Sequence, residues 1–417
     1  MIDTSTFTLP NGLRIVHHAD NYTPMVALDI LYDVGARDED PQHTGIAHLL
    51  EHMMFGGSVN VPDFDRQTER ACGWNNAWTN NDFTNFYSVA PAANAETLFW
   101  LESDRMLAPA FSPQTFEVQR NVVLEEFKQT CLNRPYGNLG HLLRRLIYRV
   151  HPYRWPTIGL TPDHVASLTL DRVKDFFHTH YTPDRAVLSV AGNITFERTV
   201  CLAEKWFGTI PRGDSPRRSL PAEPLPDSPR RFIAQGASEP QTSITIAFPM
   251  MAQGEPGYEA ADIITDILAA GRASRFHQEL VAGGNIFTEA DASILGSAEP
   301  GFIMVNGLIS PDIDDAERQA EDALLRQISR ITEQGVTPYE LQRAVNRFES
   351  QSKYANTGIL AKAQALAKAT MMGFDINTVT ARYRALTVDE INDTARRLLR
   401  PEFSSTLIYR TRSQGSV

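Results

Sequence analysis

The chain has 417 residues, of which 42% are hydrophobic, and its formal net charge is −11 at pH 7. This length predicts two domains with enough apolar material for their cores, and the composition shows no sign of disorder. The acidic balance argues against a nucleic-acid-binding surface, which needs basic patches, and no apolar run of about 18 residues predicts a transmembrane helix.

The first 18 residues, MIDTSTFTLPNGLRIVHH, predict a strand, a Pro-Asn-Gly turn and a second strand. They contain neither the basic segment nor the apolar segment of a secretory signal. Three isolated cysteines, Cys72, Cys131 and Cys201, suggest neither a disulfide framework nor a thiolate zinc site. We therefore expect a soluble, cytoplasmic protein, with a periplasmic location as the alternative if a signal peptide has been removed.

The pentapeptide HLLEH puts two imidazoles and a carboxylate on one turn of a predicted helix. His48 and His52 are four residues apart and Glu51 is three residues after His48, so all three side chains project from one face. Two neutral imidazoles can bind zinc, and the carboxylate can take a proton from activated water. This order is the inverzincin signature. The alternative is a surface helix without metal.

Residues 75–87, NNAWTNNDFTNFY, predict a β-hairpin. Residues 74–79 and 83–89 have strand-forming composition, and the Asn-Asn-Asp segment between them favours a turn. An edge strand beside a metal can pair with an extended peptide through main-chain hydrogen bonds. The alternative is a core hairpin whose aromatic side chains only pack.

Residues 116–127, FEVQRNVVLEEF, predict a helix after the start signal Ser112-Pro113. The helix ends in two acids, Glu125 and Glu126. Neighbouring helical positions point about 100° apart, so only one of the two can face a metal. A catalytic zinc needs three protein ligands, and a distant acid is a candidate for the third. Spacing alone does not choose between this role and a solvated acid pair.

Residues 211–229 are rich in Pro, Ser and Arg and predict a linker. The two sides of this linker carry a weak internal repeat. The segment from Leu170 can be laid against that from Val388, with Pro183 opposite Pro401, and both predict a helix, a proline stop and an apolar strand. We therefore predict the following organisation: a zinc-bearing domain at 1–211, a linker at 212–229 and a metal-free homologous domain at 230–417.

The HLLEH motif, residues 75–87 and RNVVLEEF at 120–127 together resemble the pitrilysin/insulinase family of zinc peptidases. They are most similar to bacterial members that resemble mitochondrial processing peptidase, as are HPYRWPTIG at 151–159 and YTPDRAVLSVAGN at 181–193. The resemblance covers nearly the whole chain. It implies an α+β fold with two similar domains, each an antiparallel sheet packed with helices, that form half of a clamshell.

The resemblance also implies the roles of the metal-site residues. The ligands correspond to His48, His52 and Glu126, and the general base corresponds to Glu51. The family usually has a further acid two helical turns before the ligand glutamate, where this chain has Gln119. An amide cannot ionise, but it can hydrogen-bond a metal ligand.

The internal alignment replaces each of these residues in the second half. The residues opposite His48, Glu51, His52 and Glu126 are, in that order, Ala261, Ile264, Thr265 and Gln351. We therefore expect a metal-free second domain and one Zn²⁺ per chain.

Substrate handling is also implied by the resemblance. The family's N-A-x-T strand binds the peptide backbone, which implies substrate binding by Asn76, Ala77 and Thr79. The family's second half supplies an Arg and a Tyr, where this chain has Val281 and Thr288. Neither residue can offer a guanidinium or a phenol to a developing oxyanion. Some bacterial members are heterodimers in which a related chain brings the Arg and Tyr.

We therefore predict a zinc metalloendopeptidase that hydrolyses peptides or unfolded polypeptide segments, as the zinc-bearing subunit of a heterodimer. A homodimer is the alternative assembly. Two alternative functions are a non-peptidase scaffold subunit and a zinc hydrolase with another class of substrate.

Overall fold

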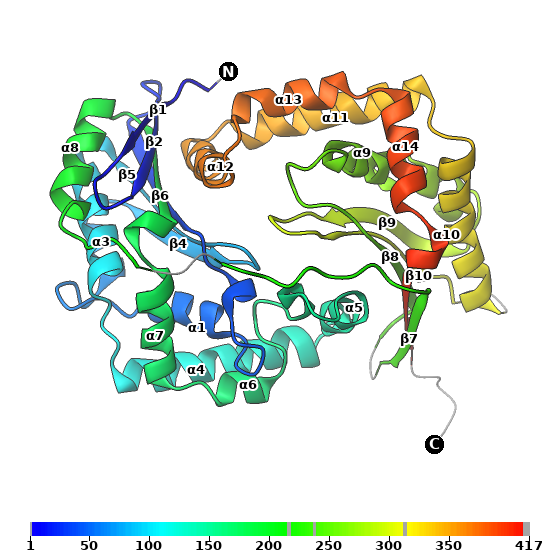
Figure 1. Ribbon diagram of the computed structural model, residues 1–417, viewed down its shortest axis with the longest axis horizontal. Helices are drawn as coiled ribbons and strands as arrows, with labels where there is room; N and C mark the ends of the chain where they lie inside the picture. Colours follow the sequence, from blue (N-terminus) through cyan, green and yellow to red (C-terminus); the bar gives the residue numbers. More distant parts are fainter. Residues whose placement is uncertain (1, 215–217, 237–238, 312–314, 412–417) are drawn as a thin grey trace. The chain divides into compact units, whose positions relative to one another are not determined.

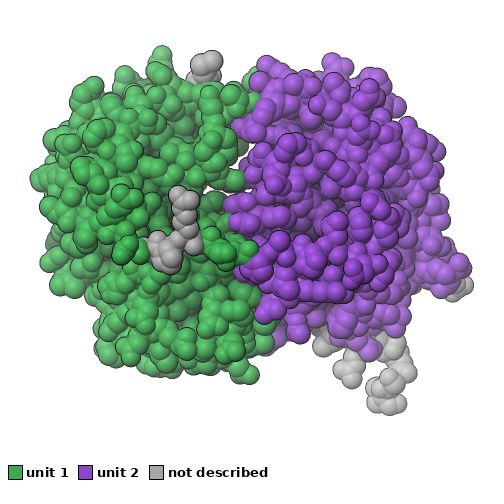
Figure 2. All heavy atoms as spheres, viewed as in Figure 1, with its two compact units in different colours: residues 1–128, 155–220, 352–378 green, residues 129–154, 221–351, 379–417 purple. Residues whose placement is uncertain are grey.

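The computed structural model describes residues 2–214, 218–236, 239–311 and 315–411 and divides the chain into two compact units. Figure 2 colours unit 1 (residues 1–128, 155–220 and 352–378) and unit 2 (residues 129–154, 221–351 and 379–417). Each unit is built from three separate stretches of the chain. Residues 129–154 belong to unit 2, and residues 352–378 belong to unit 1. The division into domains at 1–211 and 230–417 with a linker at 212–229 stays a prediction.

Unit 1 is built on a six-stranded sheet with the order β1-β2-β6-β3-β5-β4 (Figure 1). Neighbouring strands are antiparallel except for β2 and β6, which are parallel. The strands are β1 (Ser5–Thr8), β2 (Arg14–Ala19), β3 (Met25–Tyr32), β4 (Trp74–Thr79), β5 (Thr84–Pro91) and β6 (Ala186–Gly192).

Helices cover both faces of this sheet. The larger core joins β3 to α1, α3, α7 and α8, and a smaller cluster on Ala27, Val89 and Ala191 packs against Ala363 of α12. Coverage on both faces explains why the central strand β3 is an almost continuous apolar run instead of an alternating one. The helices of this unit are α1 (Ile46–Met53), α2 (Phe64–Arg70), α3 (Ala95–Leu107), α4 (Pro113–Phe127), α6 (Pro162–Ala166), α7 (Leu170–His180), α8 (Phe196–Phe207) and α12 (Ile359–Met372).

Unit 2 repeats this topology in a five-stranded sheet with the order β7-β11-β8-β10-β9. The pair β7 and β11 is parallel, as β2 and β6 are, and the remaining pairs are antiparallel. Helix α5 packs on one face of this sheet and α9, α10 and α14 on the other. The strands are β7 (Arg230–Gln235), β8 (Ser243–Pro249), β9 (Phe287–Leu295), β10 (Phe302–Ile309) and β11 (Ser405–Arg410). The helices are α5 (Leu139–Ile147), α9 (Tyr258–Ala269), α10 (Ala316–Glu333) and α14 (Val388–Leu398), while α11 (Pro338–Ala355) and α13 (Ile376–Ala385) cross the unit boundaries.

The predicted α+β class with two helix-packed sheets is confirmed, although each sheet is mixed, with one parallel pair. The repeat is visible in the elements: α7, the turn at Pro183 and β6 match α14, the turn at Pro401 and β11. Within the described part of the chain, no helix is long and apolar enough to cross a membrane.

The predicted linker contains no helix or strand in its described residues, but it is attached at two points. In unit 1 the Arg218 guanidinium donates to the carboxylates of Asp38 at 2.6 Å and Asp33 at 2.9 Å. In unit 2 the Glu223 carboxylate accepts from the backbone N–H groups of residues 149, 150 and 151 at 2.8–2.9 Å. The composition of this segment does not reveal these attachments.

Candidate metal centre

Helix α1 starts at a backbone position that favours glycine. Gly45 caps the helix with φ of 95°, a left-handed conformation that costs other residues energy. The buried Glu39 carboxylate accepts from the N–H groups of Gly45 at 2.9 Å and Ala47 at 3.0 Å. A carboxylate at this end of a helix satisfies unpaired donors and interacts favourably with the helix dipole. These contacts fix the first turn, which carries His48.

His48 and His52 on α1 face Glu126 on α4. A Glu126 carboxylate oxygen lies 3.7 Å from His48 Nε2 and 3.5 Å from His52 Nε2. One potential ligand atom from each of the three residues lies within 4.8 Å of the other two. Ligands roughly 2.0–2.2 Å from a tetrahedral zinc are roughly 3.3–3.6 Å apart, so this donor set fits the ion with small adjustments.

The neighbouring acids of α4 point in different directions. Glu126 faces the two histidines, whereas Glu125 pairs with Lys128 at 2.6 Å and is exposed. Helix α4 itself starts at Pro113, where the Ser112 hydroxyl accepts from the Thr115 N–H at 3.0 Å. The structure thus separates the two acids that sequence spacing left equivalent.

The local environment keeps His48 neutral. Burial lowers the pKa of His48 to about 3, and the neighbouring His52 acts in the same direction. A neutral imidazole is the form that binds a metal. His48 Nδ1 is buried and has no hydrogen-bond partner among the described residues.

Glu51 lies on the same helix, and its carboxylate accepts a hydrogen bond of 2.5 Å from the Thr79 hydroxyl. Burial raises the pKa of Glu51 to about 7, the Thr79 bond lowers it and the nearby charge of Glu126 raises it. A carboxyl group with a pKa near neutrality can both accept and return a proton at physiological pH.

Strand β4 forms the edge of the unit 1 sheet and carries the three predicted substrate-binding residues. It pairs with β5 along its length, from Trp74 opposite Val89 to Thr79 opposite Thr84. Asn76 is exposed and Ala77 is half-buried. The Thr79 hydroxyl donates to Glu51 and so connects this strand to α1. Its predicted substrate contact stays a prediction.

Other predicted positions are less connected to the site. Among the described residues, no hydrogen bond joins Gln119 to a candidate ligand. Val281 ends a π-helical turn, and the Thr288 hydroxyl on β9 donates to Gln241 at 3.1 Å; both lie in unit 2. Glu39 was missed, because no sequence pattern links an acid to a glycine cap six residues later.

The left-handed caps of α1 and α9 refine the internal alignment. Gly45 and Gly257 have φ of 95° and 98°. Counting from them, the residues equivalent to His48, Glu51 and His52 are Ala260, Ile263 and Ile264, each one residue before the position that the sequence alignment gave. None of these three residues has a side chain that can bind a metal, so the metal-free second domain stays our expectation.

Two family models match the chain. Residues 14–157 match the model described as insulinase (peptidase family M16), and residues 167–348 match the M16 inactive domain. Over 288 residues, the chain is 29% identical to zinc protease PqqE of Helicobacter pylori. The aligned region makes up 68% of this chain and 65% of that protein. It is 29% identical over 265 residues to the mitochondrial-processing peptidase subunit beta of Saccharomyces cerevisiae, covering 62% of this chain and 56% of that protein. The chain thus spans less than two thirds of either relative.

The fold is shared with a protease from Helicobacter pylori of known crystal structure. The TM-score is 0.90 at 23% sequence identity, and the likeness covers 98% of this chain and 100% of that one. Together, the two matched models, these relatives and the paired sheets establish that the chain belongs to the insulinase/pitrilysin-type M16 peptidase family.

Proposed function

We propose that this protein is a zinc metalloendopeptidase that cleaves peptides or unfolded polypeptide segments, with one zinc per chain. The observation that carries the proposal is the group of His48, His52 and Glu126 beside Glu51. The donor set, the neutral His48 and a carboxyl group with a pKa near 7 suit hydrolysis. Support also comes from the relatives whose names include zinc protease and processing peptidase.

Each residue has a defined part in the proposed reaction. His48, His52 and Glu126 would hold the ion, which supplies Lewis acidity toward water and the scissile carbonyl. Glu51 takes the proton from the attacking water and returns it to the leaving amine. The Thr79 hydroxyl orients the Glu51 carboxylate.

The free edge of β4 supports an extended peptide as the substrate. A peptide added to this edge would bind through main-chain hydrogen bonds, largely independently of its side chains. The residues that would contact it are Asn76, Ala77 and Thr79. This geometry favours a peptidase over a zinc hydrolase for another class of substrate.

We further propose that the active form is a heterodimer with a related chain that supplies an Arg and a Tyr. The support is the presence of Val281 and Thr288 where the family resemblance places those two residues. A homodimer stays the alternative assembly. The cytoplasmic location also stays a prediction.

The test is the variant Glu51→Gln, which keeps the shape of the side chain and removes the base. We expect it to retain zinc and to lose about 10²–10⁴-fold in turnover of a fluorogenic peptide by the assembled enzyme. Glu125→Gln is the matched control, because that acid is exposed and faces away from the histidines. A Glu51→Gln enzyme with near wild-type turnover would overturn the assignment of the base. A wild-type chain that binds zinc but cleaves no peptide in any assembly would favour the scaffold function.

A further inference from the structure

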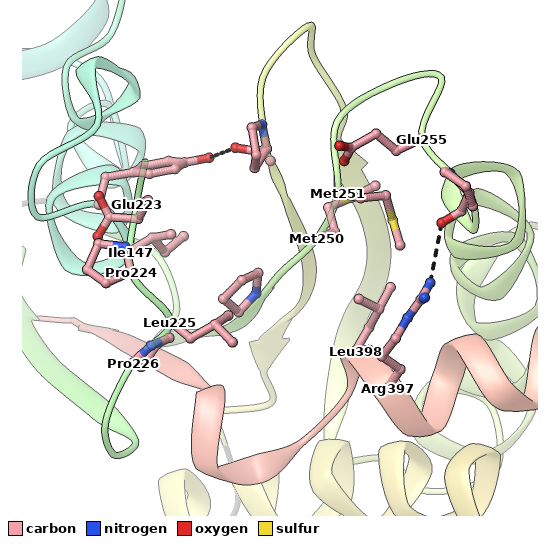
Figure 3. A pocket seen from close by; sticks show the side chains of 15 residues that line it. Ile147, Glu223, Pro224, Leu225, Pro226, Met250, Met251, Glu255, Arg397 and Leu398 are labelled. Carbon is pink, nitrogen blue, oxygen red and sulfur yellow. Dashed lines mark hydrogen bonds between the residues drawn. The ribbon is translucent and has the colours of Figure 1, made fainter. Parts of the chain in front are cut away.

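Unit 2 contains a pocket of about 450 Å³ that is separate from the metal-site residues (Figure 3). Its size is within the range of roughly 300–1,000 Å³ that is typical of small-molecule sites. Most of its surface is apolar, and the buried Met250 and Leu398 contribute to it. Methionine side chains adapt readily to apolar ligands of different shape.

The walls of the pocket offer few hydrogen-bond donors. Five lining residues are prolines, which have no backbone N–H: Pro224, Pro226, Pro249, Pro256 and Pro300. The Tyr148 hydroxyl already donates to the Pro300 carbonyl at 3.1 Å. A peptide backbone in this pocket would leave carbonyl groups without partners, which costs free energy when they are buried. An alkyl chain would meet no such penalty.

The acids of the pocket wall are engaged with the backbone. Glu223 accepts from three consecutive N–H groups, and this contact holds the segment Glu223–Pro226 as one wall. Glu255 accepts from the Ala252 N–H at 2.8 Å. The remaining charged group of the pocket is Arg397, which Figure 3 shows on the same side as Glu255 and opposite the Glu223–Pro226 wall.

Arg397 has no carboxylate partner in the described part of the chain. Its guanidinium makes one long contact, 3.4 Å to the Pro256 carbonyl. The preceding residue, Arg396, differs, because it pairs with Asp393 at 2.6 Å. The pocket therefore combines an apolar interior with a cation at its mouth that is available to a carboxylate.

We propose that this pocket binds a medium-chain fatty carboxylate. The alkyl chain lies against Leu225, Met250 and Met251, where burial of each methylene is favourable. The carboxylate pairs with Arg397 at the mouth. This binding site is independent of zinc and of the proposed peptidase activity.

The experiment measures binding of decanoate to the full chain by isothermal titration calorimetry, below the concentration at which the ligand forms aggregates. Decan-1-ol tests the need for the carboxylate, and acetyl-leucyl-leucine tests a peptide carboxylate. We expect decanoate to bind saturably at one site and more tightly than either comparison ligand. No binding, or tighter binding of the peptide, would overturn the proposal.

Two variants locate the site. Arg397→Gln is expected to weaken decanoate binding by roughly ten-fold or more and to leave decan-1-ol unchanged. Arg396→Gln, which makes the same change in net charge outside the pocket, is the matched control and should bind decanoate like wild type. Leu225→Gln, at an exposed wall position, should weaken both ligands. Equal decanoate affinity in Arg397→Gln and Arg396→Gln, with unchanged thermal unfolding of both, would contradict the role of Arg397.

Discussion

The two units use equivalent helices in different ways. In unit 1, α1 and α4 bring together two imidazoles and a carboxylate that fit a metal ion. In unit 2, the equivalent helices α9 and α11 are joined by Asp266 and Arg347, 3.8 Å apart. Asp262 of α9 accepts a hydrogen bond of 2.7 Å from the Tyr383 hydroxyl. Asp262 and Asp266 of α9 therefore have partners within the protein itself.

This difference shows how equivalent helices of one topology can bring together different polar groups. Burial raises the pKa values of both Asp262 and Asp266, while Tyr383 and Arg347 lower them again. A buried charge is tolerated when it is paired and hydrogen-bonded. In unit 1, Glu126 of α4 is only partly buried and lies beside two imidazoles and an expected cation.

Among the tests of this difference between the units, removal of a metal ligand in unit 1 should have the largest effect. Glu126→Gln and His52→Ala are each expected to lose the bound zinc, because two remaining ligands hold a catalytic ion poorly. Glu125→Gln is the matched control and should keep one zinc per chain. Metal analysis of the purified proteins measures this. Equal zinc in Glu126→Gln and Glu125→Gln would contradict the ligand assignment.

The second effect concerns Val281 and Thr288, which stand where the family resemblance implies an Arg and a Tyr. Loss of one oxyanion donor typically costs about 10²–10³-fold in turnover, so this chain alone should be a poor peptidase. A related partner chain that carries both residues should restore activity. The comparison is turnover of one peptide by each chain alone and by the mixture, with a partner mutated at its Arg and Tyr as the control. Full activity of this chain alone would show that another group fulfils the role.

A smaller effect is expected at Thr79. Its hydrogen bond lowers the pKa of Glu51, so Thr79→Val should raise that pKa and move the acidic limb of the pH–rate profile to higher pH. The base is active when ionised, and activity at pH 6 should therefore fall about ten-fold, with a smaller loss at pH 8. Thr79→Ser keeps the hydroxyl and should behave like wild type. Equal losses at both pH values would point to a role in substrate binding instead.

The smallest effect should come from a substitution in unit 2 that changes stability alone. Tyr383→Phe removes the hydrogen bond to Asp262 and keeps the ring stacked on Phe348. We expect the free energy of unfolding to fall by about 1–2 kcal/mol, with zinc content and peptidase activity unchanged. Urea unfolding and metal analysis measure the two quantities. A loss of zinc in this variant would mean that the two units are coupled.

Local patterns were enough to predict several of the elements. The i, i+4 histidines predicted α1, the Ser112-Pro113 signal predicted the start of α4, and the proline stops predicted the repeat. Sequence spacing could not separate Glu125 from Glu126, because the choice depends on the rotation of α4 against α1. It also could not show that Glu39 supports α1, because that contact depends on the path of the loop before the helix. The attachment of Arg218 to Asp38 is a long-range contact, which local patterns do not reveal.

The position of α12 in unit 1 has a consequence for synthesis of the protein. The last strand of the unit 1 sheet ends at Gly192, whereas α12, which covers one face of that sheet, ends at Met372, about 180 residues later. At roughly 5–20 residues per second, a ribosome needs about 9–36 s to make this stretch. During that interval, the nascent chain has no α12 to cover Ala27, Val89 and Ala191. Burial of this apolar face therefore waits until the second half of the chain has been made.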